Sequence, residues 1–177
     1  LGRNMPGPRV EGETAYFHCL NRGKRSVALD LKDERSRAAF YRLVETSDVV
    51  LDNFRYGVTE RLGIDHAALI RVNPRIVSCS LTGYGETGPK RELPAYDYLI
   101  QAASGMMNLT GDPGGKPTKY GISIVDHATG LLGALSILAG LRGTEQTGEG
   151  RHIDLALLDA HVHMLSYLAA DYLNAGL

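Results

Sequence analysis

The sequence has few cysteines, and this scarcity narrows the classes of protein it can belong to. Its 177 residues include two, Cys19 and Cys79. They lie far apart in the chain, so they form neither a disulfide framework nor a spacing typical of metal ligands. Apolar residues surround both, and we therefore expect two small buried side chains, no metal site, and a reducing, cytoplasmic compartment.

The sequence also lacks an excess of either charge. The formal net charge is -1, with 44% hydrophobic and 22% charged residues. Nucleic acid and anionic membrane surfaces both call for a basic excess, so neither is an expected partner. The strongest apolar stretch, residues 131–141, contains glycines and is too short to cross a bilayer. The composition is that of an ordinary globular protein with one sizeable core.

Three short apolar or β-branched runs, at residues 26–30, 48–52 and 75–81, predict strands that are covered on both faces. The segments between them, 33–46 and 59–72, carry apolar residues at helical spacing and predict helices. Alternating strands and helices are typical of a parallel sheet with crossover connections. We therefore expect an α/β fold with a doubly wound, Rossmann-like parallel sheet.

The second half of the chain continues this alternation. Helical patterns cover residues 96–104 and 124–141, and the second is apolar nearly all round, which predicts a buried helix. We expect a polar turn over residues 144–150, a short strand over 151–155 and a last helix over 156–174.

Polar and aromatic side chains follow the second expected strand. They are Asn53, Phe54 and Arg55, with Arg61 a little further on. At the carboxyl edge of a parallel sheet they suit a nucleotide, because a ring can stack on the base and guanidinium groups bind phosphates. A solvated, turn-forming start of the next helix would look similar, and that interpretation stays open.

Asp126 stands where the chain enters the long apolar helix. On spacing alone it is a helix N-cap, a role worth about 1 kcal/mol over alanine. His127 beside it could serve as a general base, although a histidine at a helix start is more often only hydrogen-bonded. The glycine-rich residues 81–89 leave the third strand at the edge where ligands bind, or form a plain turn.

Five segments in order resemble the class III (family III, formyl-CoA-transferase-like) CoA-transferases. They read NRGKRSVALDLK, DVVLDNFRYGVTERLGI, NPRIVSCSLTGYGETGP, PAYDYLIQAASG and GISIVDHATGLLGALSILAGL, the last followed by TGEGRHIDLALLDA. The resemblance implies that residues 1–177 are a partial CoA-binding α/β domain, truncated at both ends. Its core spans residues 14–155, and the helix over 156–177 leads toward an absent small domain.

The resemblance also implies a site and a reaction. Asp126 matches the family's catalytic aspartate, which passes CoA from an acyl-CoA thioester to a carboxylic acid through aspartyl anhydride and thioester intermediates. Backbone N–H groups near Asp126 are expected to stabilise the oxyanion. The CoA-binding side chains implied by the family are Leu29, Lys32, Asn53, Phe54, Arg55, Arg61 and Tyr96. The resemblance further implies that a CoA thioester is a substrate, that no cofactor is tightly bound, and that the full-length protein forms an interlocked homodimer.

Two other functions compete with transfer. An acyl-CoA racemase or epimerase of the same fold needs a histidine where this sequence has Tyr96. Tyrosine, with a reference pKa near 10, is a poor proton shuttle at neutral pH, which favours transfer. The second alternative is a CoA-binding fragment without turnover. A plain Rossmann nucleotide-binding module is disfavoured because no G-x-G-x-x-G follows a strand.

Overall fold

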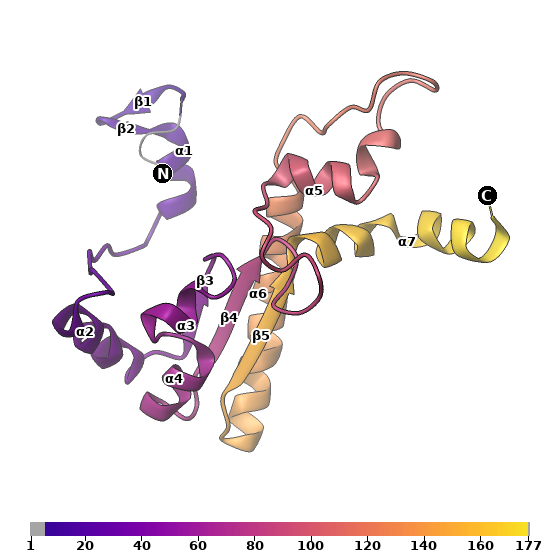
Figure 1. Cartoon of the computed structure of the whole chain (residues 1–177). Coiled ribbons are helices and arrows are strands. Elements are labelled where there is room, and N and C mark those ends of the chain that lie inside the picture. The colour runs from indigo at the N-terminus through magenta and orange to yellow at the C-terminus, as the bar shows by residue number, and fades with distance from the viewer. Residues whose placement is uncertain (1–5, 177) are drawn as a thin grey trace. The chain divides into compact units, whose positions relative to one another are not determined.

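The computed structural model describes residues 6–176, which divide after Asp30 into two compact units, residues 6–30 and 31–176 (Figure 1). The first unit has an antiparallel pair of short strands followed by a helix: β1 (Arg9–Val10), β2 (Glu13–Thr14) and α1 (Ala15–Asn21). Thr14 begins α1 as its N-cap, since its hydroxyl accepts the Phe17 N–H at 3.1 Å.

Two expectations for this unit are wrong. Residues 26–30 are irregular instead of forming a strand, and Val27 is 66% exposed. Apolar, β-branched residues form a strand only where a neighbouring strand supplies ladder hydrogen bonds, and among residues 6–30 only β1 and β2 pair. Cys19 is exposed instead of buried, because the short helix that carries it buries none of its residues.

A three-stranded parallel sheet forms the centre of the second unit. Its order is β3 (Val49–Asp52), β4 (Val77–Thr82), β5 (Arg151–Ala156). The register places Val50 opposite Ser78, and Ser78 opposite His152. The three strands lie where the sequence predicts them, and the parallel α/β architecture is confirmed.

One face of the sheet carries three short helices: α2 (Glu34–Val44), α3 (Val58–Leu62) and α4 (His66–Val72). Asp33 begins α2 as predicted, accepting the Ser36 N–H at 2.8 Å. The single helix expected over residues 59–72 is two helices, because Gly63 takes a left-handed conformation with φ of 70° that ends α3. Val44, Leu69 and Ile76 form the buried cluster on this side.

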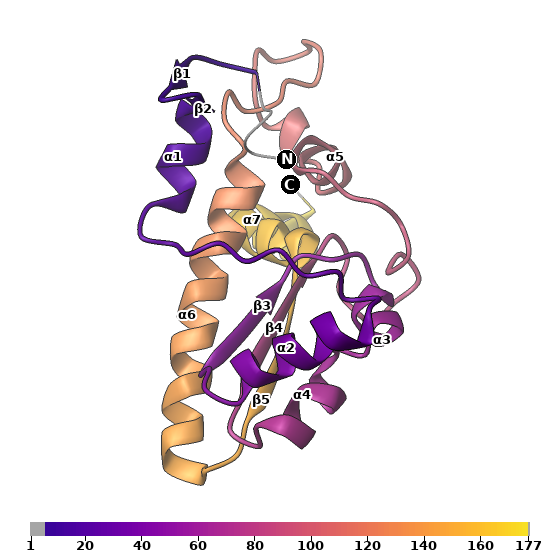
Figure 2. The same ribbon diagram turned by 90° about the vertical axis from the view of Figure 1, so that its left-hand side faces the viewer.

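The remaining helices are α5 (Asp97–Ala103), the short 3₁₀ helix η2 (Met106–Asn108), α6 (Ile124–Thr147) and α7 (Leu157–Ala175). Figure 2 shows α6 along the sheet face opposite α2 and α4. Two glycines allow this contact, since a Cβ on Gly133 or Gly140 would lie 3.1 Å from Leu155 or Val77, respectively. The helix α7 is kinked at Ser166, and residue 177, the end of the expected last segment, lies outside the described residues.

The helix α6 differs from prediction in length and burial. It runs through most of the expected turn at 144–150 and ends at Gly148, which has a left-handed φ of 77°. Leu131, Leu135 and Leu138 are 74%, 63% and 64% exposed, so the helix is not buried all round. By length and composition alone it could cross a membrane, contrary to expectation. Packing on the sheet also accounts for apolar residues in α6, because the side of the helix with Gly133 and Gly140 lies against β5 and β4.

Candidate functional site

Asp126 lies in the first turn of α6, with its side chain exposed. It is not the N-cap that its position suggested. Ser123 takes that position without a side-chain hydrogen bond to the helix. The carboxylate of Asp126 is therefore not occupied in capping its own helix.

The cap is supplied from another helix by Asp97, the first residue of α5. Its Oδ2 accepts the N–H of Val125 at 2.8 Å and that of Asp126 at 3.1 Å. Its Oδ1 accepts a hydrogen bond from Gln101, whose own Oε1 accepts the Tyr120 N–H at 2.9 Å. Because Asp97 is only 9% exposed, this carboxylate is a buried, fully bonded link between α5 and the start of α6.

The same bonds show which N–H groups at the start of α6 already have acceptors. The first N–H groups of α6 are all engaged: Ile124 donates to Ile122, Val125 and Asp126 donate to Asp97, and His127 donates to Ser123. These four N–H groups are therefore not free to bind a further acceptor, and the expectation that backbone N–H groups near Asp126 stabilise an oxyanion stays a prediction for other donors.

The surroundings of Asp126 act on its charge in two directions. Partial loss of water raises the pKa of the Asp126 carboxyl, and the negative charge of Asp97 raises it further, while His127 lowers it. The positive end of the α6 dipole favours the ionised form. An accessible carboxylate whose basicity is raised in this way is suited to nucleophilic attack.

Tyr96 is the last residue of the segment that joins β4 to α5, residues 83–96, here called the β4–α5 segment. The segment begins and ends in close contact, since a Cβ on Gly83 would lie 2.2 Å from the Ala95 Cβ. Only glycine permits that approach. The contact places Tyr96 at the carboxyl end of β4, next to Asp97, where its ring is 58% exposed and stacks on Tyr98 at 6.1 Å.

The predicted nucleotide-binding residues lie at the carboxyl end of the neighbouring strand β3. Asn53 donates a hydrogen bond to the Leu81 carbonyl near the end of β4. Phe54 is 42% exposed, and Arg55 is exposed beside it. Arg61 is exposed on α3. The structure thus places Asn53, Phe54 and Arg55 at the expected edge of the sheet and Arg61 on the helix that follows, while the contact of all four with CoA stays a prediction.

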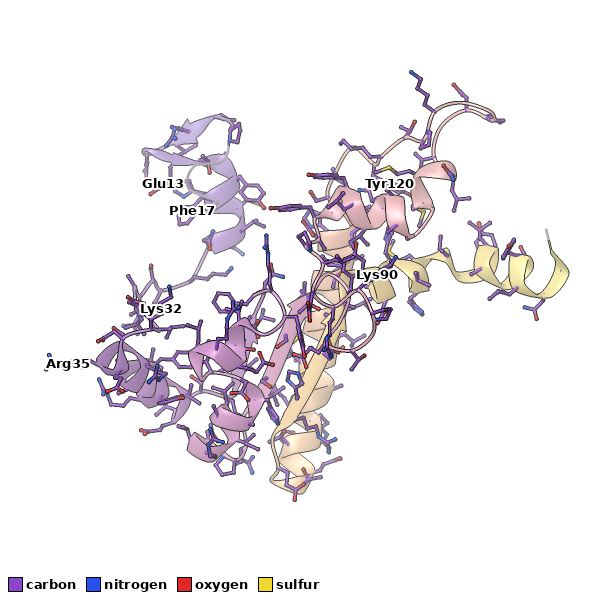
Figure 3. All side chains as sticks on the ribbon, in the orientation of Figure 1. Glu13, Phe17, Lys32, Arg35, Lys90 and Tyr120 are labelled. Carbon is purple, nitrogen blue, oxygen red and sulfur yellow. The ribbon has the colours of Figure 1, made fainter. Side chains whose placement is uncertain are left out.

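Lys32 and Leu29 are the two other residues assigned to CoA. Figure 3 shows Lys32 with Arg35 at the α2 side of the second unit, and Tyr120 beside α5. Leu29 belongs to the first unit and is described apart from the second. Their assignment to the adenosine end of CoA stays a prediction.

Comparison with known proteins decides the family. The sequence model described as CoA-transferase family III matches residues 1–177. The chain belongs to CoA-transferase family III. The resemblance proposed from the five segments is therefore confirmed.

Relatives of this chain in the family include named enzymes. It is 43% identical over 92% of its length to a succinate–glutarate CoA-transferase of Agrobacterium fabrum, and 43% identical over 91% to an acetyl-CoA:oxalate CoA-transferase of Acetobacter aceti. The chain spans 40% and 42% of those two proteins. A crystal structure of a CAIB/BAIF family protein from Brucella suis matches with TM-score 0.94 and 40% identity, over 99% of this chain and 48% of that one.

Lys90 and Arg91 of this family III chain were not among the candidate site residues expected from the sequence. The Arg91 guanidinium lies 4.7 Å from the Tyr56 ring centroid. The ammonium of Lys90, which is labelled in Figure 3, lies 6.0 Å from the Tyr84 ring centroid. Arg91 therefore approaches the segment that carries Arg55. The available signal was the pair of adjacent cations directly after the glycine-rich residues.

Asp97 was missed as well, although the sequence held a signal for it. Asp97 and Gln101 stand four residues apart on an expected helix, a spacing at which two side chains meet. Cys79, in contrast, is buried as predicted, and burial raises the pKa of its thiol, as do the charges of Asp52 and Asp154. Such a thiol is unreactive.

Proposed function

We propose that the full-length protein is an acyl-CoA:carboxylate CoA-transferase in which Asp126 is the nucleophile. The observation that carries the proposal is the exposed Asp126 carboxylate in the first turn of α6, where Asp97 holds the helix end in place. Two relatives are named succinate–glutarate CoA-transferase and acetyl-CoA:oxalate CoA-transferase, and these names support the same reaction class.

The first half of the reaction forms a thioester between CoA and the Asp126 carboxyl group. The Asp126 carboxylate attacks the thioester carbonyl of the donor, the C–S bond breaks, and CoA leaves as a thiolate from a mixed anhydride. The thiolate then attacks the aspartyl carbonyl of the anhydride and releases the donor acid as a carboxylate. The enzyme now carries an Asp126–CoA thioester, and no proton has been gained or lost.

The second half repeats these steps in reverse with a new acid. The acceptor carboxylate attacks the aspartyl thioester, releasing CoA thiolate and forming a second anhydride. Attack of the thiolate on the acceptor acyl carbon gives the new acyl-CoA and frees the Asp126 carboxylate. Because Asp126 reacts only when ionised, activity should fall at low pH as the carboxylate is protonated.

The exposed residues at the carboxyl edge would hold CoA. Phe54 offers a face for stacking, and Arg55 and Arg61 offer guanidinium groups for phosphate, with Arg91 close by. Tyr96, next to Asp97, would lie near the acyl end, and Leu29 and Lys32 near the adenosine. The proposal extends to a Rossmann-like CoA-binding domain, a homodimer and a cytoplasmic location for the full-length protein.

Covalent capture tests the nucleophile. The full-length protein is incubated with succinyl-CoA, treated with hydroxylamine or borohydride, and digested for peptide mass spectrometry. We expect the modification on Asp126 and loss of transfer in Asp126→Ala. Asp159→Ala is the matched control, since Asp159 is an exposed aspartate in the first turn of α7. Labelling of another residue, or full transfer by Asp126→Ala, would refute the proposal.

A further inference from the structure

A polar network crosses the face of the sheet opposite α6. Val77 of β4 contacts α6, so the next residue, Ser78, points to the other face. Ser78 is only 5% exposed there. Its hydroxyl oxygen lies 2.8 Å from Nδ1 of His66 on α4 and 2.8 Å from Nδ1 of His152 on β5.

The network continues from His152 to the β4–α5 segment. Nε2 of His152 lies 2.9 Å from the Glu86 carboxylate, and the Glu86 N–H donates to Asp154 at 2.9 Å. Two residues of β5 therefore hold Glu86 at two points. In the same segment, Tyr84 packs on the buried cluster that includes Val125, the residue before Asp126.

The hydrogens of the network can be assigned from its acceptors. An ionised Glu86 only accepts, so Nε2 of His152 carries a hydrogen. When His152 is neutral, its Nδ1 must accept, and the Ser78 hydroxyl donates to it. The Ser78 oxygen then accepts from His66, so Nδ1 of His66 carries a hydrogen. All three bonds are satisfied with their donors pointing in one direction, from His66 toward Glu86.

We propose that Ser78 and His66 are positioning residues: they hold His152 in the tautomer that donates to Glu86, and so anchor the β4–α5 segment to β5. The segment leads directly to Tyr96 and Asp97, so its order affects the place of Asp126. The effect on catalysis rests on the proposed CoA-transferase function, whereas the anchoring of the segment does not.

The anchor should also depend on pH. The charged groups around the pair are Glu86, Asp154 and Asp65, with Asp52 further along β3. Burial lowers the pKa of His66, and a charged His152 lowers it further, while Asp65 and Glu86 raise it. The ring centroids of the histidines are 5.3 Å apart. Protonating both would set two cations side by side and leave the buried Ser78 hydroxyl with two donors facing it.

A direct measurement in the unmodified protein tests the assignment. Histidine ¹⁵N NMR of the full-length protein at pH 7.5 should show the Nε2–H tautomer for His152 and the Nδ1–H tautomer for His66. An Nδ1–H tautomer of neutral His152 would overturn the proposal. This measurement needs no variant and no activity.

Hydrogen–deuterium exchange with matched variants tests the anchor. Ser78→Ala should speed exchange of residues 83–96 about 2- to 10-fold, the effect of losing one net hydrogen bond. Ser80→Ala is the control, because Ser80 lies on the same strand and face but donates to Asp52, at 2.8 Å. Equal exchange of this segment in both variants would overturn the proposal.

Two further variants separate hydrogen bonding from charge. Glu86→Gln keeps an oxygen that accepts from His152, so segment exchange should stay near the wild-type rate, whereas Glu86→Ala should match Ser78→Ala. In the wild type, exchange corrected for intrinsic rates should be flat at neutral pH and rise once the pH is low enough for both histidines to be protonated, which burial of His66 opposes. A segment that exchanges at the same corrected rate from pH 8 to pH 5 contradicts the proposal.

Transfer kinetics then connect the segment to the reaction. Ser78→Ala should change KM for acyl-CoA or kcat at pH 7.5, and Glu86→Gln should restore most of the difference that Glu86→Ala produces. If the wild type transfers no CoA, the proposed function fails while the tautomer and exchange results still decide the anchor. If transfer occurs but segment exchange is unaffected by Ser78→Ala, only the anchor fails.

Discussion

Replacing Asp97 with asparagine should weaken the start of α6 and change the acidity of Asp126. The Asp97 carboxylate accepts three hydrogen bonds, two from the N–H groups of Val125 and Asp126 and one from Gln101. Gln101 cannot turn its amide round without cost, because its oxygen accepts the Tyr120 N–H. Asparagine has one oxygen and one NH₂ group, so in either orientation a donor faces a donor.

The size of the effect follows from these contacts. A hydrogen bond to a charged group contributes about 1.5–3 kcal/mol, and loss of a helix cap costs about 0.5–2 kcal/mol. Neutral bonds kept by the amide oxygen recover part of this, so we expect Asp97→Asn to lower the free energy of unfolding by about 2–4 kcal/mol. The measurement is the urea midpoint of the full-length protein, with Asp159→Asn, at an exposed helix start, as the control.

The same substitution should also change the pKa of the Asp126 carboxyl. The charge of Asp97 raises the pKa of Asp126, so removing it should lower that pKa. The acid limb of kcat/KM against pH should therefore move to lower pH in Asp97→Asn, even though the variant is less stable. A loss of less than about 0.5 kcal/mol, the size of an ordinary surface substitution, would refute the capping role. An acid limb that moves to higher pH would refute the electrostatic one.

Two other predictions concern stability. Neither ring nitrogen of the buried His161 has a hydrogen-bond partner among residues 6–176, and burial lowers the pKa of His161, partly opposed by Asp97. Below about pH 6.5 the unfolded chain therefore binds more protons than the folded one, so the free energy of unfolding should fall as the pH is lowered. The fall in urea midpoint between pH 7.5 and 5.5 should be smaller in His161→Gln than in the wild type, and equal falls would contradict the prediction. Gly83→Ala should lower the melting temperature and speed exchange of residues 83–96, because its Cβ would lie 2.2 Å from Ala95; Gly121→Ala, with open space around it, is the control, and equal effects would count against the close contact.

Much of the fold could be predicted because it depends on local pattern. The runs that form β3 and β4 are short and rich in apolar or β-branched residues, and α2 begins after an aspartate that caps it. The predictions failed where a contact with a distant part of the chain decides whether a strand forms or which side of a helix is buried. Residues 26–30 have strand composition without the pairing that makes a strand, and α6 has a buried pattern although its leucine face is exposed. Helix periodicity cannot reveal which side of an apolar helix meets the sheet.

In the candidate site, too, the features that depend on local sequence could be predicted and those that depend on tertiary contacts could not. The exposed residues after β3 could be placed at the carboxyl edge because parallel strands end together there. Asp126 was found through the order of its surrounding segments, yet its expected role as a cap was wrong. That role belongs to Asp97, 28 residues away from Val125, and periodicity within one helix carries no information about such a partner.

The sequence by itself thus determined the family, the alternation of strands and helices, and the residues that stand at strand ends, since all three depend on neighbours along the chain. The tertiary structure decided which groups those residues meet. It assigned the first N–H groups of α6 to their acceptors, and it set Ser78 between two histidines, one of them 74 residues away. The contact between Ser78 and His152 depends on the register of β4 and β5, parallel strands joined by a long crossover, and a shift of one residue would turn one of these two side chains to the other face.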